Sequence, residues 1–220
     1  ACGSAVFWAV ASLAPLNIDR YGAEQLSLPE VGIGVLLCML VLGVGAGSLL
    51  AGYWSGGRVE LGLVPLGAVG IAVSSLLVFV AGSWIDASPN ETAGQAFFWS
   101  SVCLVMLGIS AGLFNVPLEA YLQHSSDVRK RGTILAGSNF VSFSFILLSC
   151  GLFWLLHGVF DLTPAQIFMV AGLGTIPVVI DAFRLLPDIT IRFLFWLASH
   201  TIYRVRVIGD EHLPEHGGAL

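Results

Sequence analysis

The sequence predicts an all-α membrane protein whose helices cross the bilayer. Two observations carry this prediction: charged residues make up only 10% of the 220 residues, and several apolar runs are long enough to span a membrane. A typical soluble domain carries about 25% charged residues, which help to cover its surface. The low charge therefore excludes an ordinary soluble enzyme and a disordered chain. The net charge of −5 leaves no basic footprint for a nucleic acid.

The apolar runs set the number of helices. A helix that crosses the hydrocarbon core needs about 20 mainly apolar residues. Five runs qualify as whole spans, and an apolar run at the start of the chain is typical of the second part of a truncated span. These spans are predicted at residues 31–52, 62–82, 97–118, 133–157 and 165–183, with the truncated one at 1–16. Because the chain begins inside an apolar stretch and stops in mid-pattern, we expect a piece of a longer protein.

The basic residues are divided unequally between the two sides of these spans. The connections 17–30, 83–96 and 158–164 alternate with the others and hold a single basic residue, Arg20. Short loops rich in Lys and Arg stay in the cytoplasm. We therefore expect the other side, and the C-terminus with it, to be cytoplasmic. That side holds the remaining eight of the nine basic residues: Arg58, Arg129, Lys130, Arg131, Arg184, Arg192, Arg204 and Arg206.

Small residues at a spacing of four predict where helices pack on each other. In lipid, small side chains let helix backbones approach closely. The smooth faces serve tight packing alone or, in addition, let helices rock during transport. The spacing occurs at Gly43, Gly47 and Ala51, at Gly52 and Gly56, and at Gly108 and Gly112.

Three polar residues are candidates for a binding pocket, because polar groups at membrane depth are expensive. Asn115 and Glu119 are four residues apart and share a helix face, which Gln123 extends. Asn139 lies about two turns into the next span, from the same side. We expect these residues to meet in one pocket in the inner leaflet. The alternative is that Asn115 and Asn139 only bond each other or a backbone carbonyl.

Arg58 and Glu60 are candidates for an inner gate, since both lie in a short inner loop. In this interpretation their charges pair with neighbouring helices in one conformation only. The alternatives are that Arg58 only sets the topology and that Glu60 favours the start of the next helix through its dipole.

The run Arg129-Lys130-Arg131 is an orientation signal at the inner face. Its charges also attract anionic head groups of membrane lipids. On the outer side we expect Asp19 and Arg20 in a loop, although Asn17 and Asp19 could face a substrate path. His157 is expected as a polar tip that reaches the outer interface.

The chain changes character after the last span, so we divide it into residues 1–185 and 186–220. Residues 189–203 predict a short helix at the membrane interface, because about 15 residues reach only about 22 Å. The alternation over 203–208 predicts a strand. A cytoplasmic α/β domain is therefore expected to begin here.

Several of these features together resemble the major facilitator superfamily. The inner loop at 52–62 resembles the inner-loop signature of that superfamily, without the usual acidic residue before Arg58. The runs 7–13, 51–67 and 115–120 are similar to its lysophospholipid transporters. The tail 203–220 is similar to the start of a glycerolipid acyltransferase of the 1-acylglycerol-3-phosphate type. The resemblance implies the six-helix C-terminal half of a major facilitator bundle with its first helix truncated.

The resemblance also implies a function for the whole protein. It would move lysophospholipids across a bacterial inner membrane by alternating access, together with a missing N-terminal half. The fused domain would re-acylate them, and its catalytic motif would follow Leu220. We assign no catalytic residue, cofactor or metal. In this interpretation a polar groove binds the head group while the acyl tail stays against apolar helix surface.

Two other functions remain open from the sequence. The spans could act mainly as a membrane anchor for a lysophospholipid acyltransferase. They could also form half of a major facilitator carrier for a small solute.

Overall fold

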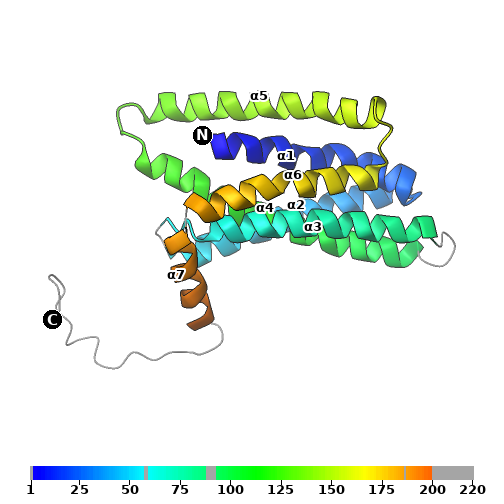
Figure 1. Ribbon diagram of the computed structural model, residues 1–220, viewed down its shortest axis with the longest axis horizontal. Coiled ribbons are helices and arrows are strands. Elements are labelled where there is room, and N and C mark those ends of the chain that lie inside the picture. The colour runs from blue at the N-terminus through cyan, green and yellow to red at the C-terminus, as the bar shows by residue number, and fades with distance from the viewer. Residues whose placement is uncertain (1, 57–58, 88–92, 186, 200–220) are drawn as a thin grey trace.

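The computed structural model describes residues 2–56, 59–87, 93–185 and 187–199 (Figure 1). Within these ranges every element is a helix and no strand forms, so the predicted all-α class is confirmed there. The elements in chain order are α1 (Cys2–Arg20), the short π-helix η1 (Tyr21–Gln25), α2 (Glu30–Ser55), α3 (Leu63–Ala87), α4 (Ala93–Ser125), α5 (Arg131–Gly158), α6 (Pro164–Leu185) and α7 (Pro187–Ala198).

Five of these helices, α2 to α6, are long and apolar enough to cross a membrane. The five whole spans predicted from the sequence coincide with these helices, whose length and apolar composition indicate a multi-pass membrane protein. The largest difference in their bounds is in α4, which continues to Ser125 although the predicted span ends at Leu118. Pro117 lies inside this helix rather than at its end, which membrane helices tolerate because neighbouring groups satisfy the freed carbonyl.

The side chains of α5 are distributed as a lipid environment requires. Its buried residues include Ser138, Ser142 and Ser149, and the Ser149 hydroxyl donates to the Ala9 carbonyl of α1. Large apolar side chains such as Phe140 point outward, with 75% of Phe140 exposed. A soluble helix would bury its apolar face. The reversed pattern is the one expected of a helix whose outer face lies against an apolar environment.

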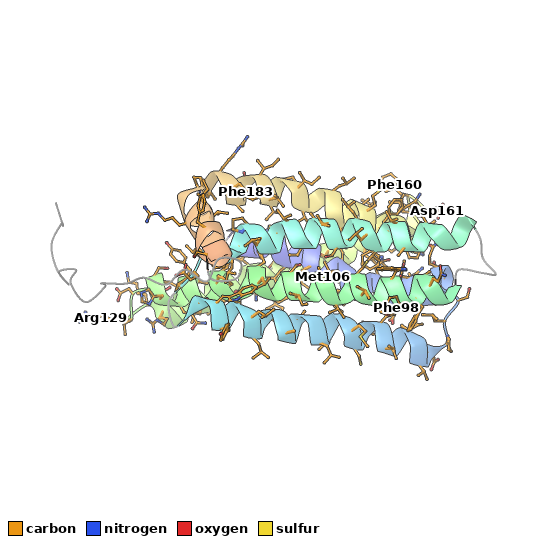
Figure 2. All side chains as sticks on the ribbon, turned by 90° about the horizontal axis from the view of Figure 1, so that it is seen from below. Phe98, Met106, Arg129, Phe160, Asp161 and Phe183 are labelled. Atoms are coloured by element: carbon orange, nitrogen blue, oxygen red, sulfur yellow. The ribbon has the colours of Figure 1, made fainter. Side chains whose placement is uncertain are left out.

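Successive long helices run in alternating directions along the longest axis of the molecule (Figure 1). The ends of α2, α4 and α6 lie together at one end of the bundle, beside the starts of α3, α5 and α7. Figure 2 shows Arg129 at this end and Asp161 at the opposite one. The alternation predicted for the connections is therefore present in the described part of the chain.

The predicted packing of small residues is confirmed between α2 and α4. A Cβ atom added to Gly47 would lie 2.7 Å from Ile109 Cα, and one added to Gly112 would lie 2.6 Å from Ser48 N. The two helices therefore touch backbone to backbone along this line, which we call the glycine seam and define by Gly43, Gly47, Gly108 and Gly112.

The prediction for Gly52 and Gly56 is wrong. A Cβ atom on Gly52 would meet none of the described atoms within 4 Å. Gly56 has φ +53° and caps the C-terminus of α2 through a hydrogen bond from its N–H to the Tyr53 carbonyl. Glycine is favoured there because the left-handed conformation costs it no Cβ clash.

The first helix also differs from the prediction, because it continues through Asp19 and Arg20 instead of ending in an outer loop. The physical reason is a row of inward polar side chains. Asn17 Nδ2 donates to the Pro164 carbonyl at 2.7 Å. One turn later, the Tyr21 hydroxyl contacts Ser100 Oγ at 2.8 Å and donates to a carbonyl of α3. These bonds satisfy the Asn17 amide N–H and the Tyr21 hydroxyl, whereas Asn17 Oδ1 is buried without a partner among the described residues.

The last helix, α7, crosses the end of the bundle at a steep angle to the other helices (Figure 1). Its buried Phe193 packs against Ala51 and Leu63, at the connection between α2 and α3. Its first residue, Pro187, suits the first turn of a helix because proline there loses no hydrogen bond. The predicted short helix is therefore present, with bounds earlier than 189–203. The strand predicted at 203–208 lies outside the described residues.

Candidate functional site

The three polar residues predicted to share a pocket line one groove in the structure. This polar groove has a volume of about 250 Å³ and lies between α1, α4 and α5. Asn115 and Glu119 come from α4, one turn apart, and Asn139 comes from the first half of α5. The full lining is Trp8, Asn115, Glu119, Asn139, Ser142, Phe143 and Ile146.

The geometry does not favour the alternative in which the asparagines only satisfy each other. Asn139 is exposed, and the Oδ1 atom of Asn115 is buried without a hydrogen-bond partner among the described residues. A buried acceptor without a partner is unusual, because no hydrogen bond compensates for the loss of its hydration. Asn115 is therefore the residue of the groove with unused hydrogen-bonding capacity.

A second hollow of about 220 Å³ lies beside the groove. Apolar side chains from five helices line most of it, among them Leu40, Ile71, Leu107 and Phe168. We call it the apolar cavity. Its complete lining is Trp8, Ala11, Ala14, Pro15, Leu40, Val44, Ser48, Ile71, Ser75, Leu107, Ala111, Gly112, Asn115, Phe168 and Ala171.

The two hollows share Trp8 and Asn115. These residues therefore lie where the polar groove and the apolar cavity meet, and we call this place the neck. Such a pair of compartments matches the chemistry of an amphiphile. The groove offers a carboxylate, two carboxamides and a hydroxyl, whereas the cavity excludes a charged group because it would have to lose its hydration.

The other candidates from the sequence lie away from this pair of hollows. Gln123 is exposed and does not line the groove. Arg58 lies outside the described residues. The Glu60 carbonyl accepts a hydrogen bond from the Leu63 N–H at 3.4 Å, so this residue leads into α3. The gate proposed for the pair stays a prediction.

The basic run lies at the turn before α5, and all three side chains are exposed. The Asp127 carboxylate accepts a hydrogen bond from the Arg129 N–H at 3.0 Å, and the Asp127 carbonyl accepts one from the Lys130 N–H at 2.9 Å. The turn therefore projects Arg129, Lys130 and Arg131 from the same end of the bundle, where lipid head groups could reach them.

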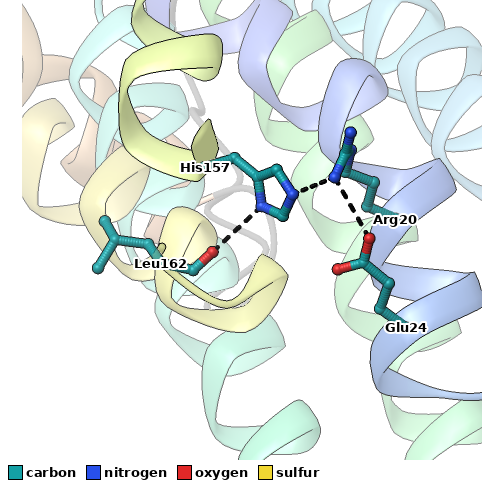
Figure 3. Close-up of polar contacts among 4 residues, drawn as sticks. All are labelled: Arg20, Glu24, His157 and Leu162. Carbon is teal, nitrogen blue, oxygen red and sulfur yellow. Dashed lines mark hydrogen bonds and ion pairs between the residues drawn. The ribbon is translucent and has the colours of Figure 1, made fainter. Parts of the chain in front are cut away.

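The opposite end holds a contact that the sequence does not predict (Figure 3). His157 is not an isolated polar tip, because its Nε2 contacts Arg20 Nη1 and its Nδ1 lies 3.4 Å from the Leu162 carbonyl. Arg20 also pairs with Glu24 at 3.3 Å and lies over the ring of Phe153. Arg20, Glu24, Phe153 and His157 form an outer clamp between α5 and the α1–η1 segment.

Sequence reasoning missed the apolar cavity and the role of Trp8 in the neck. A tryptophan in an apolar run has no distinctive spacing, so only the packing of α1 against α4 and α5 could reveal it. Ser142 was detectable in principle, because it lies one turn after Ser138 and three residues after Asn139 on a helix that buries serines.

Among the described residues, no three His, Cys, Asp or Glu side chains are placed to hold a metal ion. Comparison with known proteins gives no relative to guide the interpretation further. No protein-family model, no curated protein and no solved structure matches the chain.

Proposed function

We propose that this chain is the C-terminal half of a major facilitator transporter that moves lysophospholipids across a bacterial inner membrane. The head group binds in the polar groove. The observation that carries the proposal is the neck at Trp8 and Asn115, the two residues that line both a polar groove and an apolar cavity. A carrier for a small polar solute has no use for the second compartment, whereas a lipid with one acyl chain needs both.

The helix packing supports this architecture through an internal symmetry. The main contacts join α1 with α5 and α6, α4 with α2 and α3, and α3 with α6. The first three long helices correspond to the last three, α1 to α4, α2 to α5 and α3 to α6. Under this correspondence the contacts of α1 with α5 and α6 become those of α4 with α2 and α3, and the α3–α6 contact maps onto itself. Because α1 and α4 run in opposite directions (Figure 1), the relation is that of an inverted repeat of three helices. Such repeats build each half of a major facilitator protein.

The charge distribution supports the orientation. Arg129, Lys130, Arg131 and Arg184 belong to one end of the bundle, and Arg20 belongs to the other. By the positive-inside rule the first end faces the cytoplasm. The polar groove then opens in the inner leaflet, since it lies near the end of α4 and the start of α5. The segment after α7 would continue into a cytoplasmic acyltransferase that consumes the delivered lysolipid.

The test combines binding by this chain with transport by the full-length transporter, since a lone half should not transport. Radiolabelled lysophosphatidylethanolamine is the probe, in lipid nanodiscs for binding and in inverted and right-side-out vesicles for transport. We expect Asn115→Ala and Glu119→Ala each to weaken binding and transport by about tenfold, the loss of roughly one good polar contact. Membrane insertion should be unchanged.

Gln123→Ala is the matched control, because Gln123 lies one turn beyond Glu119 on the same helix but outside the groove. It should bind and transport like the unaltered protein. Unchanged transport in both groove variants would reject the groove as the site. Saturable uptake of a sugar or drug that lysophosphatidylethanolamine does not compete with would instead support a small-solute carrier.

A further inference from the structure

We propose that Asn115 selects lipids with one acyl chain, because its Oδ1 accepts a hydrogen bond from the free glycerol hydroxyl while the chain fills the apolar cavity. The proposal rests on the proposed function. It adds a position in the structure for each part of the lipid. It also specifies which apolar helix surface the acyl tail contacts, namely the wall of the apolar cavity.

Asn115 holds an unsatisfied acceptor at the neck. Its Oδ1 is buried there and has no hydrogen-bond partner among the described residues. Leaving such an acceptor unpaired costs about 1–3 kcal/mol, so a ligand that supplies a donor at this point gains affinity. A lysophospholipid has one uncharged donor between its head group and its chain, namely the hydroxyl of the glycerol.

The residues along α4 follow the order of the parts of a lysolipid. Glu119, Asn115, Ala111 and Leu107 follow each other at a spacing of four and line the two hollows. Glu119 belongs to the groove alone, Asn115 to both hollows, and Ala111 and Leu107 to the cavity alone. The twelve steps along the helix from Leu107 to Glu119 cover about 18 Å. Polar head, hydroxyl and hydrocarbon chain occur in the same order in a lysolipid.

The hydrogen bond at the neck also disfavours a second acyl chain. In a lipid with two chains the same glycerol oxygen is an ester, which has no hydrogen to donate. Asn115 Oδ1 would then stay unpaired. A site that hydrogen-bonds a hydroxyl rejects an analogue without it more strongly than it rejects a change in apolar size.

The first experiment measures binding to this chain in nanodiscs of three radiolabelled phosphatidylethanolamines. They are the 1-acyl lysolipid, its analogue with hydrogen in place of the free hydroxyl, and the diacyl lipid. We expect the unaltered chain to bind the lysolipid about tenfold more tightly than the deoxy analogue, and the diacyl lipid more weakly still. Asn115→Leu should bind the lysolipid and the deoxy analogue equally. Gln123→Leu, the matched control outside the groove, should keep the preference.

The experiment measures the ratio of the affinities for the lysolipid and the deoxy analogue. A variant that binds all lipids more weakly would keep this ratio, so it would not mimic the loss of preference. The unaltered chain alone also tests the proposal if Asn115→Leu does not fold. Equal affinity of the unaltered chain for the lysolipid and the deoxy analogue would overturn it, and so would a preference that survives in Asn115→Leu. Absence of binding of all three lipids would instead reject the proposed function.

The second experiment locates the chain with a lysophosphatidylethanolamine that carries a photoactivatable diazirine at mid-chain. We expect adducts on Leu107 and Phe168 that excess unlabelled lysolipid removes. Ser48→Leu narrows the cavity at a residue whose hydroxyl bonds only back to Val44 of its own helix. If it excludes about two methylenes, at about fourfold in affinity for each, labelling of the cavity should fall by about 15-fold.

Ala46→Leu is the matched control, because Ala46 is exposed on the same helix and does not line the cavity. It should label like the unaltered chain. Displaceable adducts confined to outward residues such as Val41 and Val102 would place the chain on the helix surface and overturn the proposal. Undiminished labelling of the cavity in Ser48→Leu would overturn it as well.

Discussion

Two helix pairs in this bundle are packed in contrasting ways. In the α2–α4 pair, glycines bring the two backbones into contact along the glycine seam. In the α1–α5 pair, polar groups connect the helices: Ser149 bonds to the Ala9 carbonyl, and Arg20 contacts His157 at the outer clamp. The polar groove lies along the second pair, where α4 contributes Asn115 and Glu119.

The difference indicates which part of the bundle is fixed and which can adjust to a ligand. Dispersion contacts between close backbones fall steeply with separation, so the glycine seam has one favourable distance. The contacts of the outer clamp are about half exposed, so lipid head groups or water can replace them at little cost. We therefore infer that α2 and α4 form the rigid frame and that α5 is the movable wall of the site.

The largest expected effect comes from overpacking the glycine seam. Gly47→Ala places a Cβ atom 2.7 Å from Ile109 Cα, so the two helices must separate. We expect a loss of stability of about 1–3 kcal/mol, the usual cost of overpacking. Thermal unfolding of the purified chain in detergent measures it.

Gly45→Ala is the control for this substitution, because an added Cβ atom there meets none of the described atoms within 4 Å. It should leave stability unchanged or raise it slightly, since alanine is the better helix former. Equal melting temperatures for the two variants would show that the seam is not a close contact.

A smaller effect is expected from the polar row on α1 and η1. Tyr21→Phe removes the contact with Ser100 Oγ and the bond to the Val78 carbonyl. Hydrogen bonds between membrane helices contribute about 0.6 kcal/mol on average, so we expect a loss of about 1 kcal/mol. Tyr53→Phe is the matched control, because Tyr53 is 82% exposed. A Tyr21→Phe protein as stable as this control would contradict the role of the row.

The smallest effect on stability is expected at the outer clamp. Arg20 is about half exposed, and exposed ion pairs contribute little, so Arg20→Met should change stability by less than about 0.5 kcal/mol. It should instead loosen the outer end of α5, measured as faster hydrogen exchange of backbone amides near His157. Arg129→Met, at the other end of the bundle, should leave that exchange unchanged. Slower exchange in Arg20→Met would argue against a clamp.

The sequence allowed prediction of the spans and the glycine seam because both depend on local patterns. Apolar length defines a span, and small residues at a spacing of four define a contact face. It was possible to predict the group of Asn115, Glu119 and Asn139. Polar side chains at membrane depth are energetically expensive, and the helical spacing places these residues near each other. The role of Trp8 and the apolar cavity was not predictable, because a hollow depends on how five helices leave space between them. The continuation of α1 past Asp19 depends on distant partners such as Pro164.

The most direct test of the movable-wall model measures distances across the two helix pairs with and without lysophosphatidylethanolamine. Spin labels at Leu16 and Leu155 report on α1 and α5, and labels at Leu42 and Met106 report on α2 and α4; all four residues are exposed. Native cysteines are replaced by serine. We predict that the lipid shifts and narrows the distance distribution across α1 and α5 and leaves that across α2 and α4 unchanged. A shift across the glycine seam, or no change at either pair, would contradict the model.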